Sequence, residues 1–138
     1  MTTTLALQTV LDGPRNCVIK ITGSTTSADQ AYTVIAAPGN FQGIDFSGTL
    51  KAADWWIKQI TYNVQDLLSV QLLWDATTPL LIQSMEGRGK MEADRYGGLP
   101  NNSGAGKTGA IGIQTVGGTA QSAQLNYTIE LELVKTQT

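Results

Sequence analysis

The segment "NNSGAGKTG" (residues 101–109) contains the residue types that bind phosphate in many nucleotide-binding proteins. The phosphate-binding loop has the pattern G-x-x-x-x-G-K-[ST], in which backbone N–H groups and a lysine hold the phosphates. Gly106, Lys107 and Thr108 match the end of this pattern, but Asn101 stands where its first glycine should be. Such a loop also needs a strand that enters it and a helix that leaves it, because the helix N-terminus points at the phosphates.

The residues that follow this loop predict a strand and not a helix. Ile111, Ile113 and Thr115 alternate with small or polar residues, which is the period of a β-strand. We therefore interpret the segment as a glycine-rich turn that enters a strand, and we expect no cofactor to bind there.

Few other groups in the chain can do chemistry. The sequence has no histidine, so the commonest general base and metal ligand is missing, and its one cysteine, Cys17, excludes an internal disulfide and a multi-thiolate metal site. A small hydrolase could still use carboxylates, but the candidates are scattered and nothing pairs them: Asp45, Asp54, Asp75 and Asp94. We predict that the protein is not an enzyme and has no catalytic, cofactor-binding or metal-binding residues.

Two adjacent tryptophans are candidates for contact with a partner. In a strand, neighbouring side chains point to opposite faces, so one of Trp55 and Trp56 faces inward and the other faces outward. An outward indole could stack on a sugar ring, as in a carbohydrate-binding module, or pack against another subunit. The alternative is that it packs under a loop of its own chain.

A charged stretch and the N-terminus supply the other contact candidates. The charges at Glu86, Arg88, Lys90, Glu92 and Asp94 all occupy even positions, so they point the same way if the segment is extended. This pattern is typical of an exposed edge strand or hairpin protected by its charges. The alternative is a mixed-sign contact with a neighbouring protein through Arg88, Lys90 and Glu92.

Residues 1–12 can be interpreted in two ways. They form either an N-terminal arm that reaches a neighbour or the first strand of the fold. In the first case, Leu5 and Leu7 would contact a partner.

Alternation with a period of two recurs along the chain and predicts an all-β fold. The clearest strand runs from Leu125 to Leu133, and Cys17, Ile19 and Ile21 form one face of an early strand. Further strands are predicted at residues 32–36, 56–64, 68–74, 80–85 and 111–115. We predict about eight strands in an antiparallel β-sandwich or jelly-roll-like fold, as a single domain over residues 1–138.

One of these strands has a helical alternative. In residues 56–64, we expect Trp56, Ile60, Tyr62 and Val64 to share one face. The apolar residues from Trp56 to Leu67 also fit the spacing of an amphipathic helix. We prefer the strand, because β-branched and aromatic residues crowd this segment and no helix cap opens it.

The charge balance does not point to nucleic acid or membrane. The 138 residues include 9 basic and 11 acidic side chains, which give a net charge of −2. No stretch has the length of a transmembrane helix, and the N-terminus lacks the basic start and unbroken apolar run of a signal peptide. We expect the protein to be made and kept in a cytoplasm, or assembled there into something larger.

Three segments resemble a known class of protein. S-V-Q-L-L-W-D-A-T-T-P (69–79), G-G-L-P-N-N-S-G-A-G-K-T-G (97–109) and Y-T-I-E-L-E-L-V-K (127–135) are similar to segments of small structural proteins encoded beside the capsid genes of tailed bacteriophages. The resemblance covers the second half to two-thirds of the chain, and residues before Ala52 match nothing in that family. In that family the glycine-rich segment is a loop and not an ATP site.

The resemblance implies a β-sandwich virion protein, assembled in the host bacterial cytoplasm. Its function would be that of a decoration or cement protein that binds the major capsid protein on the outside of the head. It would be a homo-oligomer, with a homotrimer favoured. The alternative function is a carbohydrate- or receptor-binding module of a tail or fibre that uses an exposed tryptophan.

Overall fold

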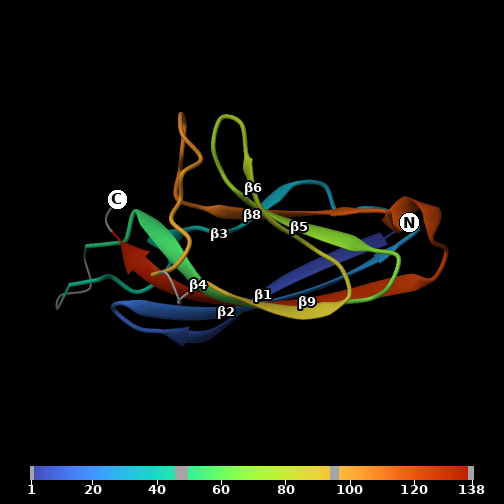
Figure 1. Ribbon diagram of the computed structural model, residues 1–138, viewed down its shortest axis with the longest axis horizontal. Coiled ribbons are helices and arrows are strands. Elements are labelled where there is room, and N and C mark those ends of the chain that lie inside the picture. The colour runs from blue at the N-terminus through green and yellow to red at the C-terminus, as the bar shows by residue number, and fades with distance from the viewer. Residues whose placement is uncertain (1, 46–49, 94–96, 137–138) are drawn as a thin grey trace.

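The computed structural model describes residues 2–45, 50–93 and 97–136, which form nine β-strands in two antiparallel sheets packed as a sandwich (Figure 1). The larger sheet has five strands in the order β1-β2-β9-β4-β7. Their bounds are Thr2–Asp12 (β1), Asn16–Thr26 (β2), Gln124–Thr136 (β9), Asp54–Val64 (β4) and Arg88–Glu92 (β7).

The smaller sheet has four strands in the order β3-β8-β5-β6. Their bounds are Thr33–Ala36 (β3), Ile111–Val116 (β8), Ser69–Trp74 (β5) and Leu80–Met85 (β6). Two short 3₁₀ helices, η1 (Pro38–Asn40) and η3 (Gly118–Ala120), complete the secondary structure of the described residues. None of the helices in this part of the chain is long and apolar enough to cross a membrane. The predicted antiparallel β-sandwich is confirmed.

The core lies between the two sheets and follows the alternation in the sequence. In β2, Cys17, Ile19 and Ile21 are fully buried, and in β9 the alternate residues from Leu125 to Leu133 are at most 5% exposed. The smaller sheet contributes its own inward residues, among them Val70, Leu72, Ile111 and Ile113. Each large apolar side chain removed from water in this way contributes about 1.5–3 kcal/mol to folding.

The predicted inner face of β4 is wrong in its first half. A bulge between Ile57 and Gln59 opposite β9 inserts Lys58 as an extra residue and changes the phase of the strand. Trp55 and Ile57 therefore face the core, whereas Trp56 faces outward. The helical alternative for this segment is also wrong, because all of Asp54–Val64 is strand.

Residues 2–12 are the first strand of the fold, paired with β2 except at a bulge at Val10. Their C-terminal end is fixed by Lys135, whose side chain is fully buried. The Lys135 ammonium donates to Asp12 Oδ1 at 2.6 Å, to the Gly13 carbonyl at 2.6 Å and to the Gln42 carbonyl at 2.8 Å. One buried cation thus ties β1, the β1–β2 turn and a distant loop to β9.

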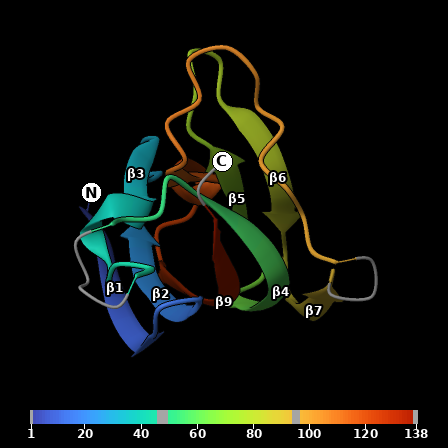
Figure 2. The same cartoon turned by 90° about the vertical axis from the view of Figure 1, so that its left-hand side faces the viewer.

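The charged stretch forms β7, which is the edge strand opposite β1 in the larger sheet (Figure 2). Arg88, Lys90 and Glu92 are all exposed, and Asp94 lies outside the described residues. The prediction of an exposed edge strand in this segment is confirmed.

Candidate functional site

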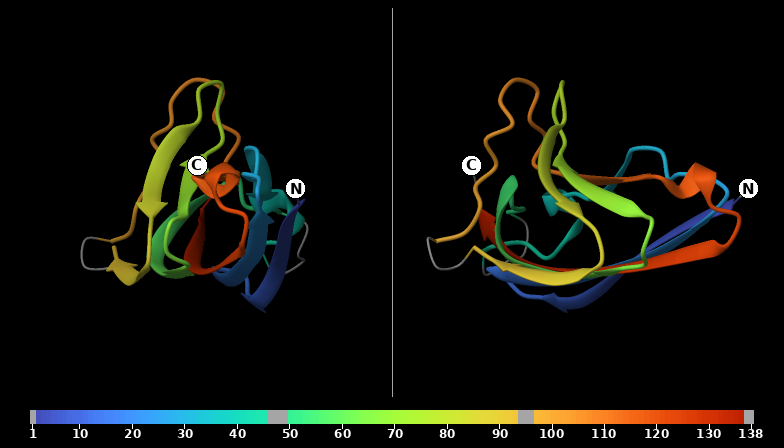
Figure 3. Two further views of the ribbon diagram at one scale, coloured as in Figure 1. Left: turned by 90° about the vertical axis from the view of Figure 1, so that its right-hand side faces the viewer. Right: turned by 45° about the vertical axis from the view of Figure 1, so that its right-hand side comes forward.

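The glycine-rich segment is an irregular loop that leads directly into β8, as the sequence predicted. It rises beside the β5–β6 connection (residues 75–79), and together the two loops form a projection from the sandwich (Figures 1 and 3). The Thr77 amide donates to the Ala105 carbonyl at 3.3 Å, and the Thr108 amide donates to the Asp75 carbonyl at 3.1 Å. These bonds hold the two loops together as one element.

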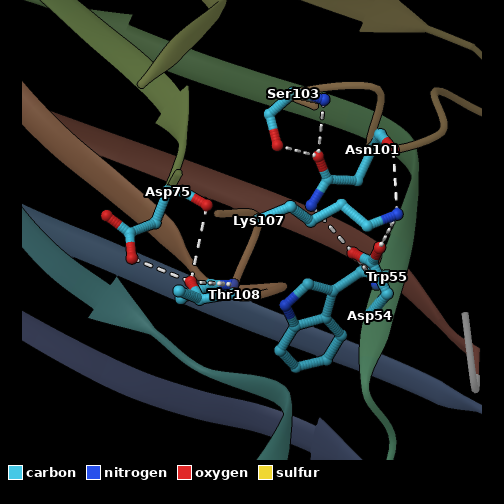
Figure 4. Close-up of polar contacts among 8 residues, drawn as sticks. Asp54, Trp55, Asp75, Asn101, Ser103, Lys107 and Thr108 are labelled. Atoms are coloured by element: carbon cyan, nitrogen blue, oxygen red, sulfur yellow. Dashed lines mark hydrogen bonds and ion pairs between the residues drawn. The ribbon is translucent and has the colours of Figure 1, made fainter. Parts of the chain in front are cut away.

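The lysine of this segment is paired with a carboxylate of its own chain. Lys107 Nζ lies 3.3 Å from Asp54 Oδ2, and the side chain of Asp54 is only 3% exposed (Figure 4). Asp54 Oδ1 accepts bonds from the Trp55 amide at 2.8 Å and from Asn101 Nδ2 at 3.1 Å. The lysine therefore neutralises a buried carboxylate, and both Asn101 and Lys107 of the segment bind a residue of their own chain.

The threonine of the segment is paired in a similar way. Thr108 Oγ1 donates to Asp75 Oδ2 at 2.8 Å, and the Tyr32 hydroxyl donates to Asp75 Oδ1 at 2.8 Å. Burial, and then the bond to Asp75, raise the pKa of Tyr32, so this tyrosine stays a neutral donor. Asp54 and Asp75 thus hold the same loop at two points through structural bonds.

The other two candidate aspartates of the sequence analysis are Asp45 and Asp94. Asp45 Oδ1 accepts the Leu50 amide at 3.2 Å within its own loop. Asp94 lies outside the described residues. Among the residues that the structure describes, no three His, Cys, Asp or Glu side chains gather as a metal ion would require.

Of the two tryptophans, only Trp56 has exposed surface. Trp55 is fully buried and packs edge-to-face on Phe41, with ring centroids 5.3 Å apart. Trp56 is half-buried on the outer face of the larger sheet, in an open hollow of about 510 Å³ that is also lined by Arg15 and Lys58. A planar ligand could reach the Trp56 indole but not that of Trp55.

The remaining contact candidates lie on the larger sheet. Arg88, Lys90 and Glu92 are on its outer face, where Lys90 and Glu92 form an exposed ion pair at 3.1 Å. Leu5 packs partly against the core, and Leu7 is 36% exposed. Whether these residues contact a partner stays a prediction.

Sequence reasoning missed how unequally the two sheets share the charged residues. None of the residues between the described bounds of β3, β5, β6 and β8 is charged. The strands of the larger sheet carry ten charged residues: Asp12, Lys20, Asp54, Lys58, Arg88, Lys90, Glu92, Glu130, Glu132 and Lys135. The uncharged segments are visible in the sequence, but they alternate with charged ones, so only the strand order reveals that they form one sheet.

We call the outward side of the smaller sheet the charge-free face, and it consists of Ser69, Gln71, Leu73, Leu81, Ser84, Val34, Gly112, Gln114 and Val116. An apolar row crosses all four strands from Val34 through Gly112 and Leu73 to Leu81. Its two ends are 45% and 48% exposed, whereas Leu73 is only 8% exposed and the side chain of Tyr32 packs against Gly112. Beside it, Gln114 Nε2 donates to Gln71 Oε1 at 2.6 Å.

Comparisons with known proteins add no identification. No protein-family model matches the sequence, and no curated protein matches it. The resemblance to bacteriophage virion proteins stays a prediction.

Proposed function

We propose that this chain is a structural virion protein of a tailed bacteriophage, a decoration or cement protein that binds the outside of the head and stabilises it. The observation that carries the proposal is the charge-free face. Protein–protein interfaces are depleted in charged residues at their centres, because an ion loses its hydration on docking. This face offers apolar and amide groups that can be buried against the major capsid protein without that cost.

The rest of the molecule is consistent with this role. The charged residues of the described strands all lie in the other sheet, which can remain in water when the charge-free face docks. A protein that binds only the assembled shell stabilises it by mass action, and many copies on one particle add their effects. The chain would act as a homo-oligomer in the virion, assembled in the host bacterial cytoplasm, by surface fit and not by catalysis.

A head-binding experiment tests this proposal. Purified protein is added to heads assembled from the major capsid protein of the phage concerned, and binding and the thermal stability of the particles are measured. We expect the protein to bind and to raise the melting temperature of the heads. A protein that does not bind heads would overturn the proposal.

Two matched variants locate the interface. Leu81→Lys places a charge on the charge-free face, and we expect it to weaken head binding by at least about tenfold, or about 1.4 kcal/mol. Thr61→Lys adds the same charge to an exposed position on the outer face of the larger sheet and should bind like the wild type. Equal losses in both variants would contradict docking through the charge-free face.

A second candidate function is favoured by the hollow around Trp56. The half-buried indole lies beside Arg15, Asn16 and Lys58, which could donate hydrogen bonds to a sugar stacked on its accessible side. The protein would then be a carbohydrate- or receptor-binding component of a tail or fibre. Glycan-array binding that is lost in Trp56→Ala and retained in Lys90→Ala would favour this function, whereas Trp55→Ala would disrupt the core and is unsuitable as a test.

A further inference from the structure

The first strand, β1, has more exposed residues than any other described strand. β1 is eleven residues long, and among the described residues no strand pairs with its outer edge. Every residue from Ala6 to Leu11 is exposed, whereas its neighbour β2 alternates between buried and partly buried positions. Val10 and Leu11 are 55% and 52% exposed. Both faces of the second half of β1, as well as its edge, are therefore open.

The other sheet edges are short or charged. β7 has five residues, three of them charged, and β3 and β6 have four and six residues. β1 has no charged residue before Asp12, and Asp12 is already paired with Lys135. Short length, charge and β-bulges are devices that keep an edge strand from pairing with another chain. β1 is long and carries no charge before Asp12, and its one bulge, at Val10, leaves the ladder from Thr2 to Thr9 regular.

We propose that the free edge of β1 pairs antiparallel with β1 of a second copy of this chain, around a two-fold axis near the middle of the strand. The two larger sheets then join into one continuous sheet. This pairing rests on the proposed function in one respect, because it would supply the homo-oligomer that the function includes. A two-fold contact of this kind forms a dimer, whereas the resemblance implies a trimer.

Several properties favour a second copy over an unrelated strand. In an antiparallel two-fold pair, each unpaired N–H and C=O group of one edge meets its counterpart on the other. Residues 2–11 of β1 carry no charged side chain, so they place no like charges opposite each other and have none with which to select a foreign partner. Opposite residues share a face, so Leu5 and Leu7 of both copies extend the core layer, and Leu7 loses its exposed surface.

The strand is also held ready to pair. Lys135 fixes its C-terminal end through Asp12, and the ladder with β2 fixes its length. A strand that is already extended loses little conformational freedom on pairing.

The oligomeric state tests the proposal. By size-exclusion chromatography with light scattering, we expect the wild-type protein to be a dimer. Leu7→Lys should raise the dimer dissociation constant at least tenfold, whereas Leu80→Lys, at a position with a similar exposure of 38%, should leave it unchanged. Circular dichroism checks that both variants fold. A wild-type monomer or trimer, or equal dissociation of both variants, would overturn the proposal.

Disulfide trapping tests the strand itself. Ala6→Cys, Leu7→Cys and Gln8→Cys are made one at a time in a Cys17→Ala background. Opposite Cα atoms in an antiparallel pair lie about 4.5–5.5 Å apart, which is within the range that a disulfide can bridge. We expect the residue on the two-fold axis to crosslink to itself most rapidly, and no crosslink at any of the three positions would contradict the pairing. A crosslinked dimer that fails to bind heads would overturn the proposed function alone.

Discussion

At the scale of single residues, side chains of the types that bind phosphate in nucleotide-binding loops make structural contacts in this chain. Lys107 and Thr108 are the residues that would hold phosphate and metal in a nucleotide-binding loop. Here the lysine neutralises the buried carboxylate of Asp54, and the threonine donates to Asp75. Because a carboxylate with little solvent contact needs a cation and hydrogen-bond donors, these residues stabilise the loop.

The Asp54–Lys107 pair should matter more for stability than an ion pair on the surface. We expect Lys107→Met to lower the free energy of unfolding by about 1–3 kcal/mol, because it leaves a buried carboxylate without its cation. The matched change Lys90→Met breaks an ion pair in which both side chains are exposed and should cost at most about 0.5 kcal/mol. Urea unfolding followed by tryptophan fluorescence measures both, and equal losses would contradict the structural role of Lys107.

Cys17 should make the protein sensitive to alkaline pH. Burial raises the pKa of its thiol from 9.0 to about 11, with a further rise from Asp12 and an opposing effect of Lys135. The folded state therefore favours the neutral thiol. The stability that comes from this preference is fully present below pH 9, where the thiol is neutral in both states, and it is lost as the pH rises through 11. We expect the free energy of unfolding to fall less steeply over this range in Cys17→Ala than in the wild type. Parallel pH profiles would contradict this prediction.

At the scale of the elements, regular alternation was sufficient to predict most of the fold. β2 and β9 keep a strict period of two, so their core residues were predicted correctly. In β4 the core residues after the bulge, Ile60 and Val64, were predicted correctly, but those before it were not. The bulge at Lys58 reverses the phase and depends on pairing with β9, which a single strand does not reveal. The glycine-rich turn was predicted, but its partner Asp54 lies 53 positions before Lys107 in the sequence and could not be paired with it.

The glycine-rich loop should depend on glycine for two separable reasons. Gly104 and Gly109 both have positive φ angles, +86° and +84°, but only at Gly109 would a Cβ collide with the Ala53 carbonyl. We expect Gly104→Ala to cost about 1–2 kcal/mol through backbone strain alone. Gly109→Ala should cost clearly more, because the loop must also move away from the start of β4. Thermal unfolding measures both variants, and a similar cost at the two positions would contradict the close approach at Gly109.

At the scale of the whole molecule, the two sheets have different properties. The larger sheet carries the charges of the described strands and has two edges, the charged β7 and the long β1 without charge before Asp12, whereas the smaller sheet carries the charge-free face. Strand order creates this division, because strands from distant parts of the sequence are brought into the same sheet. A docking surface and a self-pairing edge can therefore coexist without overlapping, since they belong to different sheets.

The position of β1 at the edge of the larger sheet should be visible in hydrogen exchange. β9 is paired on both sides, with β2 and β4, whereas β1 is paired only with β2. In Leu7→Lys, which we expect to be monomeric, β1 amides bonded to β2 should therefore exchange at least about tenfold faster than β9 amides, because β1 can open without the core. In this variant, the β1 amides that point to the free edge should exchange without protection. In the wild type, where two copies pair, the same amides should be protected. Equal protection of β1 and β9 in the monomeric variant would contradict an independently opening first strand, and β1 exchange that is the same in both proteins would contradict the pairing.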